Sequence, residues 1–346
     1  MSVPPLHGRG ISINPANRFI PIYREEGEEW RDPDDPAPQT RFFRDTTKSI
    51  FAKNESPDIP FELGINPYRG CEHGCVYCYA RPTHEYLSLS CGLDFETQIF
   101  IKEDAPDLMR REFSKSSWKP QTISMSGVTD CYQPVELRLQ ITRRCLEVFA
   151  EFRNPVGIVT KNALVTRDID LLKELAKYQA AVVFISVTTL DKELARVMEP
   201  RASAPEARLR AIEELAAAGI PVGTMVAPVI PGLTDHESPA ILKAVKERGA
   251  ITAAYQMLRL PYQVKELFIT WLAQHFPERK LKVLNRILSV RDGKLNDWRF
   301  GHRMKGEGIW ADLYRQQFLL HRERVGLEPY GPSLSTEHFR DPTRLF

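Results

Sequence analysis

The segment VGIVTKNALVTRDIDLLKELAKYQAAVVFISV, residues 156–187, contains two short apolar runs with a helical pattern between them. The runs at 156–160 and 181–187 are rich in β-branched residues and almost continuously apolar, which is typical of parallel strands covered on both faces. The stretch 169–178 repeats its apolar residues at helical spacing. A strand, a helix and a second strand in this order predict a right-handed βαβ unit.

The same alternation continues on both sides of this unit. Residues 61–66, 122–127, 221–230 and 251–258 are further strand-like runs, and helical patterns follow the later ones. Six βα units suit an incomplete barrel better than a closed eightfold one. We therefore expect an α/β fold in which residues 61–277 form a partial (βα)6 TIM-like barrel, with its reactive groups at the carboxyl ends of the strands.

Two extensions are expected to flank this barrel. Residues 1–60 read as a partly irregular N-terminal extension, because residues 24–40 are acidic and proline-rich. Residues 278–346 read as a basic, mainly helical C-terminal extension. The chain has no run of 18 apolar residues and no apolar region near its first residue, so we expect neither a membrane helix nor a signal peptide. A cytoplasmic protein is the resulting expectation.

The stretch CEHGCVYC, residues 71–78, places three cysteines directly after the first expected strand. Six cysteines in 346 residues are too few for a disulfide scaffold, so a cluster of three indicates metal binding. Three thiolates on a [4Fe–4S] cluster leave one iron open, and an open position makes a metal reactive. S-adenosylmethionine (SAM) has an amine and a carboxylate that could chelate such an iron.

Two other readings of the cysteines stay open at this point. Zinc could take His73 or His84 as a fourth ligand. A thiol oxidoreductase could use the Cys75–Cys78 pair, although Cys71 would then have no role.

The pattern C-x3-C-x-Y-C, formed by Cys71, Cys75, Tyr77 and Cys78, resembles the motif of the radical SAM superfamily. The resemblance implies a (βα)6 partial barrel, one [4Fe–4S] cluster on the three cysteines, and reductive cleavage of SAM to a 5′-deoxyadenosyl radical. Four stretches, at 66–81, 99–113, 126–136 and 158–172, narrow the resemblance to one branch of the superfamily. They resemble an uncharacterised bacterial group related to spore photoproduct lyase and described as similar to DNA repair photolyases.

The resemblance also suggests where SAM binds, with Tyr77 beside the cofactor. The segment after the second strand departs from the Gly-Gly-Glu-like sequence of many relatives and offers Ser126, Thr129 and Asp130 as oxygens for the SAM ammonium. A turn with a helix N-cap is the alternative, and Asp130 fits it well.

Two further residues are predicted SAM contacts. Lys161 directly follows the third strand and matches the lysine that binds the SAM carboxylate in the resembled branch; a solvated loop lysine is the alternative. Ser186 would face the barrel interior if Val183 and Ile185 face the helices. The hydroxyl of Ser186 would then meet SAM, or else a backbone group.

The substrate is less well specified. Cys131 follows the second strand and is a candidate hydrogen-atom donor, although the resembled lyases carry their cysteine before the acidic position. Residues 279–305 contain nine Lys and Arg against two Asp, with Trp298, Phe300 and His302 among them. This composition suits nucleic-acid binding, and a solvated helix face is the alternative.

We therefore expect a radical SAM enzyme, of lyase type if it acts on a DNA lesion, that receives electrons from an external reductant of flavodoxin or ferredoxin type. The alternative is a nucleic-acid-binding protein with a structural zinc or closed iron–sulfur site and no catalysis.

Overall fold

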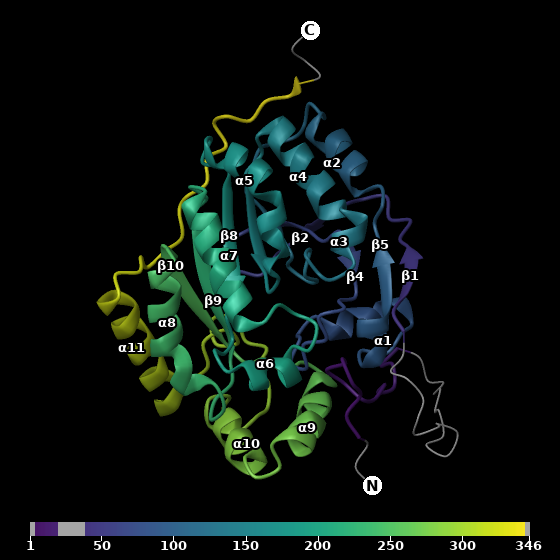
Figure 1. Ribbon diagram of the computed structural model, residues 1–346. Coiled ribbons are helices and arrows are strands. Elements are labelled where there is room, and N and C mark those ends of the chain that lie inside the picture. Colours follow the sequence, from purple (N-terminus) through teal and green to yellow (C-terminus); the bar gives the residue numbers. More distant parts are fainter. Residues whose placement is uncertain (1–3, 20–38, 343–346) are drawn as a thin grey trace.

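The computed structural model of the protein describes residues 4–19 and 39–342 (Figure 1). Most of the acidic stretch 24–40, expected to be irregular, lies outside the described residues. All six predicted strands are present, and the α/β prediction is confirmed. They are β3 (Leu63–Ile65), β6 (Ile123–Met125), β7 (Val156–Thr160), β8 (Ala181–Ser186), β9 (Val222–Val229) and β10 (Thr252–Met257).

These six strands are parallel and belong to one sheet of order β10-β9-β8-β7-β6-β3-β2. The edge strand β2 (Phe51–Lys53) is antiparallel to β3. The sheet is open, because β2 and β10 stand at opposite ends of the strand order. Along β8, the adjacent Val182 and Val183, whose side chains point to opposite faces of the sheet, are both buried. The near-continuous apolar character of this strand therefore reflects cover on both faces.

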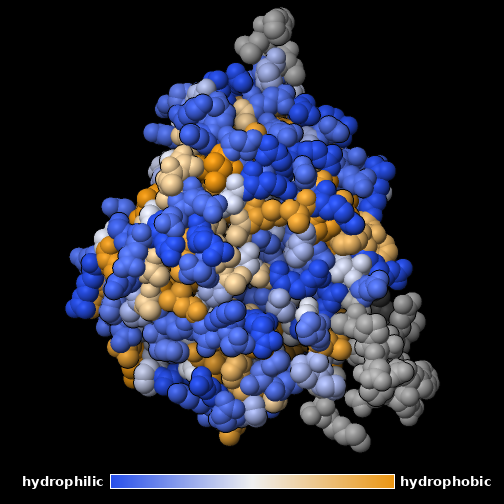
Figure 2. All heavy atoms as spheres, viewed as in Figure 1, coloured by the Kyte–Doolittle hydropathy of each residue, from blue (hydrophilic) through white to orange (hydrophobic). Residues whose placement is uncertain are grey.

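Helices cover the sheet between consecutive strands, and Figure 1 shows α5, α7 and α8 side by side over β8, β9 and β10. Hydrophilic side chains dominate the face in Figure 2, with hydrophobic ones in a band across its middle. The helices over the sheet are α2 (Ala105–Phe113), α4 (Ile141–Phe152), α5 (Ile169–Ala176), α7 (Pro205–Ala217) and α8 (Ser238–Glu247). The short helix α3 (Glu136–Leu139) precedes α4, whereas α6 (Lys192–Met198) and α9 (Val264–His275) pack in a separate apolar cluster.

The helical pattern at 135–152 is broken into two helices. Gln140, between α3 and α4, adopts a left-handed backbone with φ of 54°. The carboxylate of Glu136 accepts hydrogen bonds from the N–H groups of Thr142 (3.0 Å) and Arg143 (3.4 Å). The break lets a buried carboxylate satisfy the first N–H groups of α4, which would otherwise have no partner.

The connection between β3 and β6 is long and carries a small second sheet. Strand β5 (Gln98–Ile101) pairs with β4 (Tyr68–Arg69) and with β1 (Arg41–Arg44) of the N-terminal extension. Phe43 of β1 stacks on Phe100 of β5 with ring centroids 5.1 Å apart. Besides α2, this connection contains η2 (Arg81–Leu87) and α1 (Leu93–Thr97). Two further 3-10 helices, η3 (Ala163–Asp168) and η4 (Asp235–Glu237), lie in later connections.

The C-terminal part contains α10 (Lys280–Ser289) and α11 (Ile309–Arg324). After α11, the chain runs past the segments that precede the parallel strands. The N–H of Glu328 donates to Ile251, that of Ser335 to Gln179 and that of Arg340 to Phe152. This segment lies at the amino ends of the strands and leaves the carboxyl ends to other loops. The domain boundaries at residues 60 and 277 stay a prediction.

No helix within residues 4–19 and 39–342 is long and apolar enough to span a membrane.

Candidate active site

The cysteine loop lies at the carboxyl end of the sheet and is held by segments far away in the sequence. The N–H of Cys71 donates to Phe95 (2.9 Å) and that of Val76 to Met198 (3.1 Å). The buried Arg81 guanidinium donates to the Cys75 carbonyl at 3.0 and 2.9 Å and pairs with the buried Glu96. The loop is therefore held by contacts from both sides.

Glycine is required inside this loop. Gly74 has φ of +68°, and a Cβ there would lie 2.8 Å from a carboxylate oxygen of Glu96. Gly10 of the N-terminal segment approaches so closely that its Cβ would lie 1.7 Å from the Gly74 carbonyl oxygen. Only a residue without a side chain allows this contact. The N-terminal segment thus covers the loop.

Cys71, Cys75 and Cys78 are all free thiols in this loop. Burial raises the pKa of Cys75, and so does the Glu199 charge, while the charges of Lys161 and Arg208 lower it. Burial also raises the pKa of Cys78, against the lowering effect of Arg81 and Lys161. Three neighbouring thiols, two of them close to fixed cations, fit a site in which metal binding displaces the thiol protons. The donor set therefore suits an iron–sulfur cluster.

The two histidines considered as zinc ligands are engaged elsewhere. His73 is 1% exposed; its Nδ1 lies 3.4 Å from Asp130 Oδ2 and its Nε2 lies 3.2 Å from the Asn162 amide. His84 Nε2 lies 2.9 Å from the Gln98 carbonyl oxygen. Within the described ranges, no group of three His, Cys, Asp or Glu side chains could hold a single metal ion.

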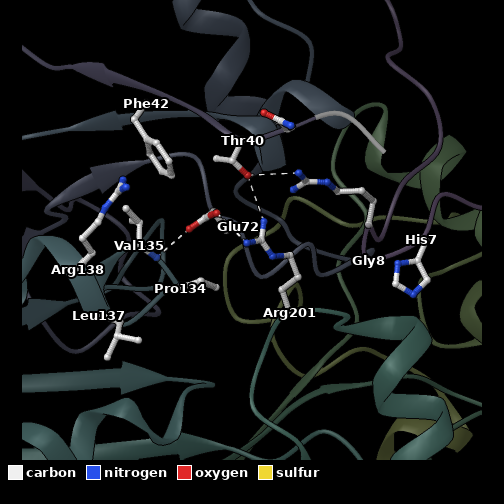
Figure 3. A pocket seen from close by; sticks show the side chains of 12 residues that line it. His7, Gly8, Thr40, Phe42, Glu72, Pro134, Val135, Leu137, Arg138 and Arg201 are labelled. Atoms are coloured by element: carbon white, nitrogen blue, oxygen red, sulfur yellow. Dashed lines mark hydrogen bonds and ion pairs between the residues drawn. The ribbon is translucent and has the colours of Figure 1, made fainter. Parts of the chain in front are cut away.

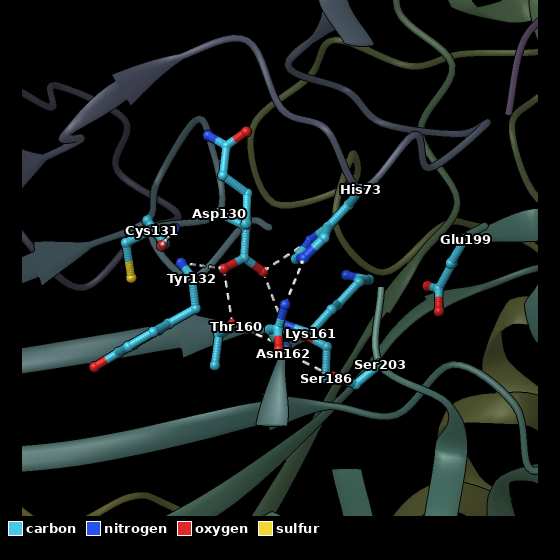
Figure 4. Close-up of polar contacts among 12 residues, drawn as sticks. His73, Asp130, Cys131, Tyr132, Thr160, Lys161, Asn162, Ser186, Glu199 and Ser203 are labelled. Atoms are coloured by element: carbon cyan, nitrogen blue, oxygen red, sulfur yellow. Dashed lines mark hydrogen bonds and ion pairs between the residues drawn. The ribbon is translucent and has the colours of Figure 1, made fainter. Parts of the chain in front are cut away.

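Asp130 joins three segments at this site (Figure 4). Besides His73, its carboxylate accepts hydrogen bonds from Thr160 Oγ1 (2.7 Å), the Lys161 N–H (2.8 Å) and the Tyr132 N–H (2.9 Å). Burial would raise the pKa of Asp130, but His73 and these hydrogen bonds lower it to about 2. The carboxylate is therefore ionised and already has four partners.

The ammonium of Lys161 lies 5.8 Å from the ring centroid of Tyr77. Within residues 4–19 and 39–342, no carboxylate forms an ion pair with it. Its positive charge is close to two of the three cysteines, as their pKa values reflect. An anionic group bound beside the cysteine loop would find this cation without a competing partner.

The hydroxyl of Tyr77 donates to Glu199, a residue that the sequence analysis did not select. Glu199 is fully buried, accepts a hydrogen bond from Thr188 Oγ1 (2.9 Å) and pairs with the buried Arg208. Burial raises the pKa of Glu199, and the Arg208 charge opposes this rise. The sequence does offer a signal for Glu199: a proline between two charged residues, EPR at 199–201, directly follows α6.

The other predicted residues make local contacts. Ser126 has φ of 78° and accepts a hydrogen bond from the Cys131 N–H (2.7 Å). Thr129 donates from its hydroxyl to the Tyr68 carbonyl oxygen (3.0 Å). Ser186 is 2% exposed at the end of β8, and its carbonyl oxygen accepts from Arg208 (3.0 Å). Their contact with SAM stays a prediction.

Cys131 is fully buried in the main apolar core. Figure 4 shows its sulfur pointing away from His73 and Lys161. Burial raises the pKa of this thiol well above its usual range, as does the Asp130 charge. Its role as a hydrogen donor stays a prediction.

A surface pocket of about 570 Å³ lies beside the cysteine loop (Figure 3). Its charged groups already contact one another: Glu72 pairs with Arg201 (3.0 Å), and Thr40 accepts from Arg9 (3.3 Å) and Arg201 (3.2 Å). No residue predicted to bind SAM is among its lining residues. The pocket therefore does not mark the predicted cofactor site.

The sequence model of the radical SAM superfamily matches residues 65–245. An uncharacterised protein of Mycobacterium tuberculosis is 37% identical over 232 residues, which are 66% of this chain and 68% of the relative. An uncharacterised protein of Methanocaldococcus jannaschii is 30% identical over 214 residues, 62% of this chain and 76% of the relative.

Among solved structures, spore photoproduct lyase complexed with dinucleoside spore photoproduct has a similar fold. The TM-score is 0.59 at 16% identity, covering 83% of this chain and 80% of that chain. Another structure of that lyase, a double mutant with bound AdoMet and the dinucleoside, gives 0.58 at 15% identity over the same shares.

Proposed function

Because the chain belongs to the radical SAM superfamily, we propose that Cys71, Cys75 and Cys78 hold one [4Fe–4S] cluster whose open iron binds SAM. One observation carries this proposal: at the carboxyl end of the sheet, three free thiols lie close to the ammonium of Lys161, which has no carboxylate partner among the described residues. When bound, the cluster supplies one electron to SAM, whose cleavage yields the 5′-deoxyadenosyl radical.

The residues around the cysteine loop have different proposed roles in binding SAM. Lys161 binds the SAM carboxylate, since its ammonium lies by Tyr77 and near Cys75 and Cys78. The ring of Tyr77 lies beside SAM, while its hydroxyl donates a hydrogen bond to Glu199. Asp130 positions Lys161 and His73 rather than meeting the SAM ammonium, because its oxygens already have four donors. Ser126, Thr129 and Ser186 remain predicted contacts.

An external one-electron carrier of flavodoxin or ferredoxin type supplies the reducing electron. The three cysteines of the loop account for one cluster. The other three cysteines, Cys91, Cys131 and Cys145, are separately buried in the described part of the chain. A second cluster as an internal relay is therefore not part of the proposal.

Nucleic acid is the proposed substrate class, with a lesion-directed lyase as the proposed reaction type. The basic stretch 279–305 supports this class, but one of its members does not face solvent. Arg291 is 1% exposed and donates to the carbonyl oxygens of Leu258 (2.6 Å), His302 (3.1 Å) and Met257 (3.2 Å). Its role is to hold loops together, and the exposed Lys282, Lys294 and Lys305 are better phosphate contacts.

Anaerobic purification tests the cofactor proposal. We expect a brown protein with about four irons per chain that cleaves SAM after dithionite reduction. Cys71→Ala, Cys75→Ala and Cys78→Ala should each lose iron and SAM cleavage. Cys145→Ala, at a buried cysteine outside the loop, is the matched control and should keep both. One zinc per chain without SAM cleavage would establish the structural-metal alternative instead.

Cys131 needs a separate experiment. A buried thiol with a raised pKa should resist iodoacetamide in the folded holoprotein and react only after denaturation. Rapid labelling of native Cys131, located by peptide mass spectrometry, would show that the thiol reaches the pocket and would strengthen its proposed role as hydrogen donor.

A further inference from the structure

Exposed aromatic side chains gather at one place on the surface. In the part of the chain that the structure describes, nine Phe, Tyr and Trp side chains are exposed. Six of them lie in segments around the carboxyl ends of the strands. They are Phe19, Tyr79, Tyr86, Tyr262, Trp298 and Phe300. Scattered exposed apolar residues are ordinary, but a contiguous group marks an interaction surface.

Five residues form a continuous row, which we call the aromatic ladder: Tyr86, Phe19, Arg18, Tyr262 and Trp298. The rings of Tyr86 and Phe19 stack with centroids 5.3 Å apart and planes 27° apart. The Arg18 guanidinium lies 5.1 Å from the Phe19 centroid and 3.5 Å from that of Tyr262. Tyr262 and Trp298 are 4.7 Å apart. The four rings are 46–73% exposed.

The ladder is built from four separate segments. Phe19 and Arg18 come from the N-terminal segment and Tyr86 from η2, whereas Tyr262 follows β10 and Trp298 follows α10. The Arg18 side chain is fixed by the buried Glu85 at 2.7 Å. Tyr262 has φ of +51°, an unfavourable backbone conformation for a residue with a side chain. The fold thus holds these side chains in place although they remain exposed.

A second row leads from the ladder to the cysteine loop. Tyr79 directly follows Cys78, and the Arg259 guanidinium lies 5.4 Å from its ring centroid. Arg303 lies 4.5 Å from the Phe300 centroid. Arg259 and Tyr262 belong to the same segment after β10, so this segment links the ladder to Tyr79, which follows the last cysteine of the loop that we propose to hold the cluster.

The charges around the rings favour an anionic partner. The acids close to them are already paired, Glu85 with Arg18, Asp58 with Arg303 and Asp297 with Arg299. Lys294 and Lys305, in the loop that carries Trp298, are exposed. Aromatic faces for bases, arginines between them and exposed lysines for phosphates are the components of a single-strand binding surface.

We propose that the aromatic ladder binds unpaired nucleotides and directs a single-stranded or locally opened nucleic acid to the cysteine loop. This inference rests on the proposed nucleic-acid substrate and specifies its conformation. Bases stack on Trp298, Tyr262, Phe19 and Tyr86, and the backbone phosphates meet the lysines of the Trp298 loop. A paired duplex keeps its bases stacked on one another, so it binds this surface less well.

The test measures binding of the anaerobically reconstituted holoprotein to fluorescein-labelled oligo-dT of about 12 nucleotides, by anisotropy at several salt concentrations. We expect single strands to bind at least ~10-fold more tightly than a duplex of the same length. Trp298→Ala and Phe19→Ala should each weaken binding by about 5- to 150-fold, which corresponds to the loss of one stacked base. Trp298→Phe should keep most of the affinity but lose tryptophan quenching by the bound strand.

Two sets of variants separate stacking from charge. Lys294→Gln and Lys305→Gln should each reduce the salt slope by about 0.7, whereas the aromatic variants change affinity without changing the slope. Tyr330→Ala, at a ring that is 83% exposed outside the ladder, is the matched control and should bind as wild type. Circular dichroism and iron content verify that each variant is folded.

The outcome is independent of the cofactor proposal. SAM cleavage by wild-type protein without nucleic acid decides the radical SAM activity, and strand binding decides the ladder. Wild-type affinity in both Trp298→Ala and Phe19→Ala, or equal binding of duplex and single strand, would overturn the inference while leaving SAM cleavage intact. If the protein binds single strands but does not cleave SAM, the proposed role of the ladder would stand and the proposed radical SAM activity would be refuted. Binding of an acidic carrier protein alone would assign the surface to the electron donor.

Discussion

Asp130 Oδ2 lies 2.8 Å from the main-chain nitrogen of Lys161, and this hydrogen bond fixes the end of β7 to the loop that follows β6. The same carboxylate contacts His73 of the cysteine loop at 3.4 Å. One side chain therefore positions the cysteine loop and the lysine that we propose to bind SAM. This arrangement makes Asp130 a positioning residue.

Replacing Asp130 by Asn should affect both stability and SAM binding. The amide keeps the shape of the carboxylate, but its NH2 group would face the N–H and hydroxyl groups that now donate to Asp130. We therefore expect the free energy of unfolding, measured in urea, to fall by ~1–3 kcal/mol. The KM for SAM should rise because the Lys161 backbone is no longer held. Asp170→Asn, at a half-exposed ion pair with Arg143, is the control and should leave the KM unchanged. An unchanged KM in Asp130→Asn would separate Asp130 from the cofactor site.

Lys161→Met should weaken SAM binding while the cluster remains. Loss of a charge-assisted contact with the SAM carboxylate predicts a KM for SAM about 10- to 100-fold higher. Iron content should be unaffected, and Lys161→Arg should recover part of the affinity because it restores the charge. The exposed Lys177→Met is the control. A loss of iron with no change in KM would place Lys161 with the cluster rather than with SAM.

The buried pair of Glu199 and Arg208 should be far more sensitive than an exposed pair. Glu199→Ala leaves the Arg208 guanidinium buried without its partner, and we expect a loss of about 3–5 kcal/mol in the free energy of unfolding. Tyr77→Phe removes only one hydrogen bond to Glu199 and should cost ~1 kcal/mol. Glu193→Ala, in a pair whose side chains are 68% and 70% exposed, should change little. Equal losses at Glu193 and Glu199 would contradict this assignment.

Stability should fall on mild acidification because of His84. Burial lowers the pKa of this histidine to about 4 from a usual value of 6.5. Between those values the unfolded chain binds a proton that the folded chain does not, so stability decreases as the pH falls. We expect His84 to account for about 2 kcal/mol of the loss between pH 7 and pH 5.

His84→Gln tests this pH dependence. Urea unfolding of the apoprotein at pH 7 and pH 5 should show a smaller loss for His84→Gln than for wild type, even if the variant is less stable at pH 7. His236→Gln, at an exposed histidine, is the control and should follow wild type. The same pH dependence in all three proteins would assign it to other groups.

Local sequence pattern was sufficient for the sheet and for the cysteine loop. The six strands are near-continuous apolar runs bounded by helical patterns, and this information lies within a few residues of each strand. The three cysteines occur within eight residues, so their spacing alone brings them together. The sequence also identified Lys161 and Asp130 as candidate site residues, because each follows a strand and parallel strands end at one edge of a sheet.

Long-range contacts decided the rest. The pairing of Glu199 with Tyr77 joins residues 122 positions apart, and His73 meets Asn162 across 89 positions, so no local pattern predicts either contact. Cys131 was a candidate hydrogen donor and Arg291 part of the basic stretch, but tertiary packing buries both side chains. The aromatic ladder likewise draws on four segments between residues 18 and 298. The sequence by itself determined the α/β fold and the cysteine motif of the family through local periodicity and spacing, whereas only the tertiary structure decided which side chains are buried, which are partnered and which are exposed.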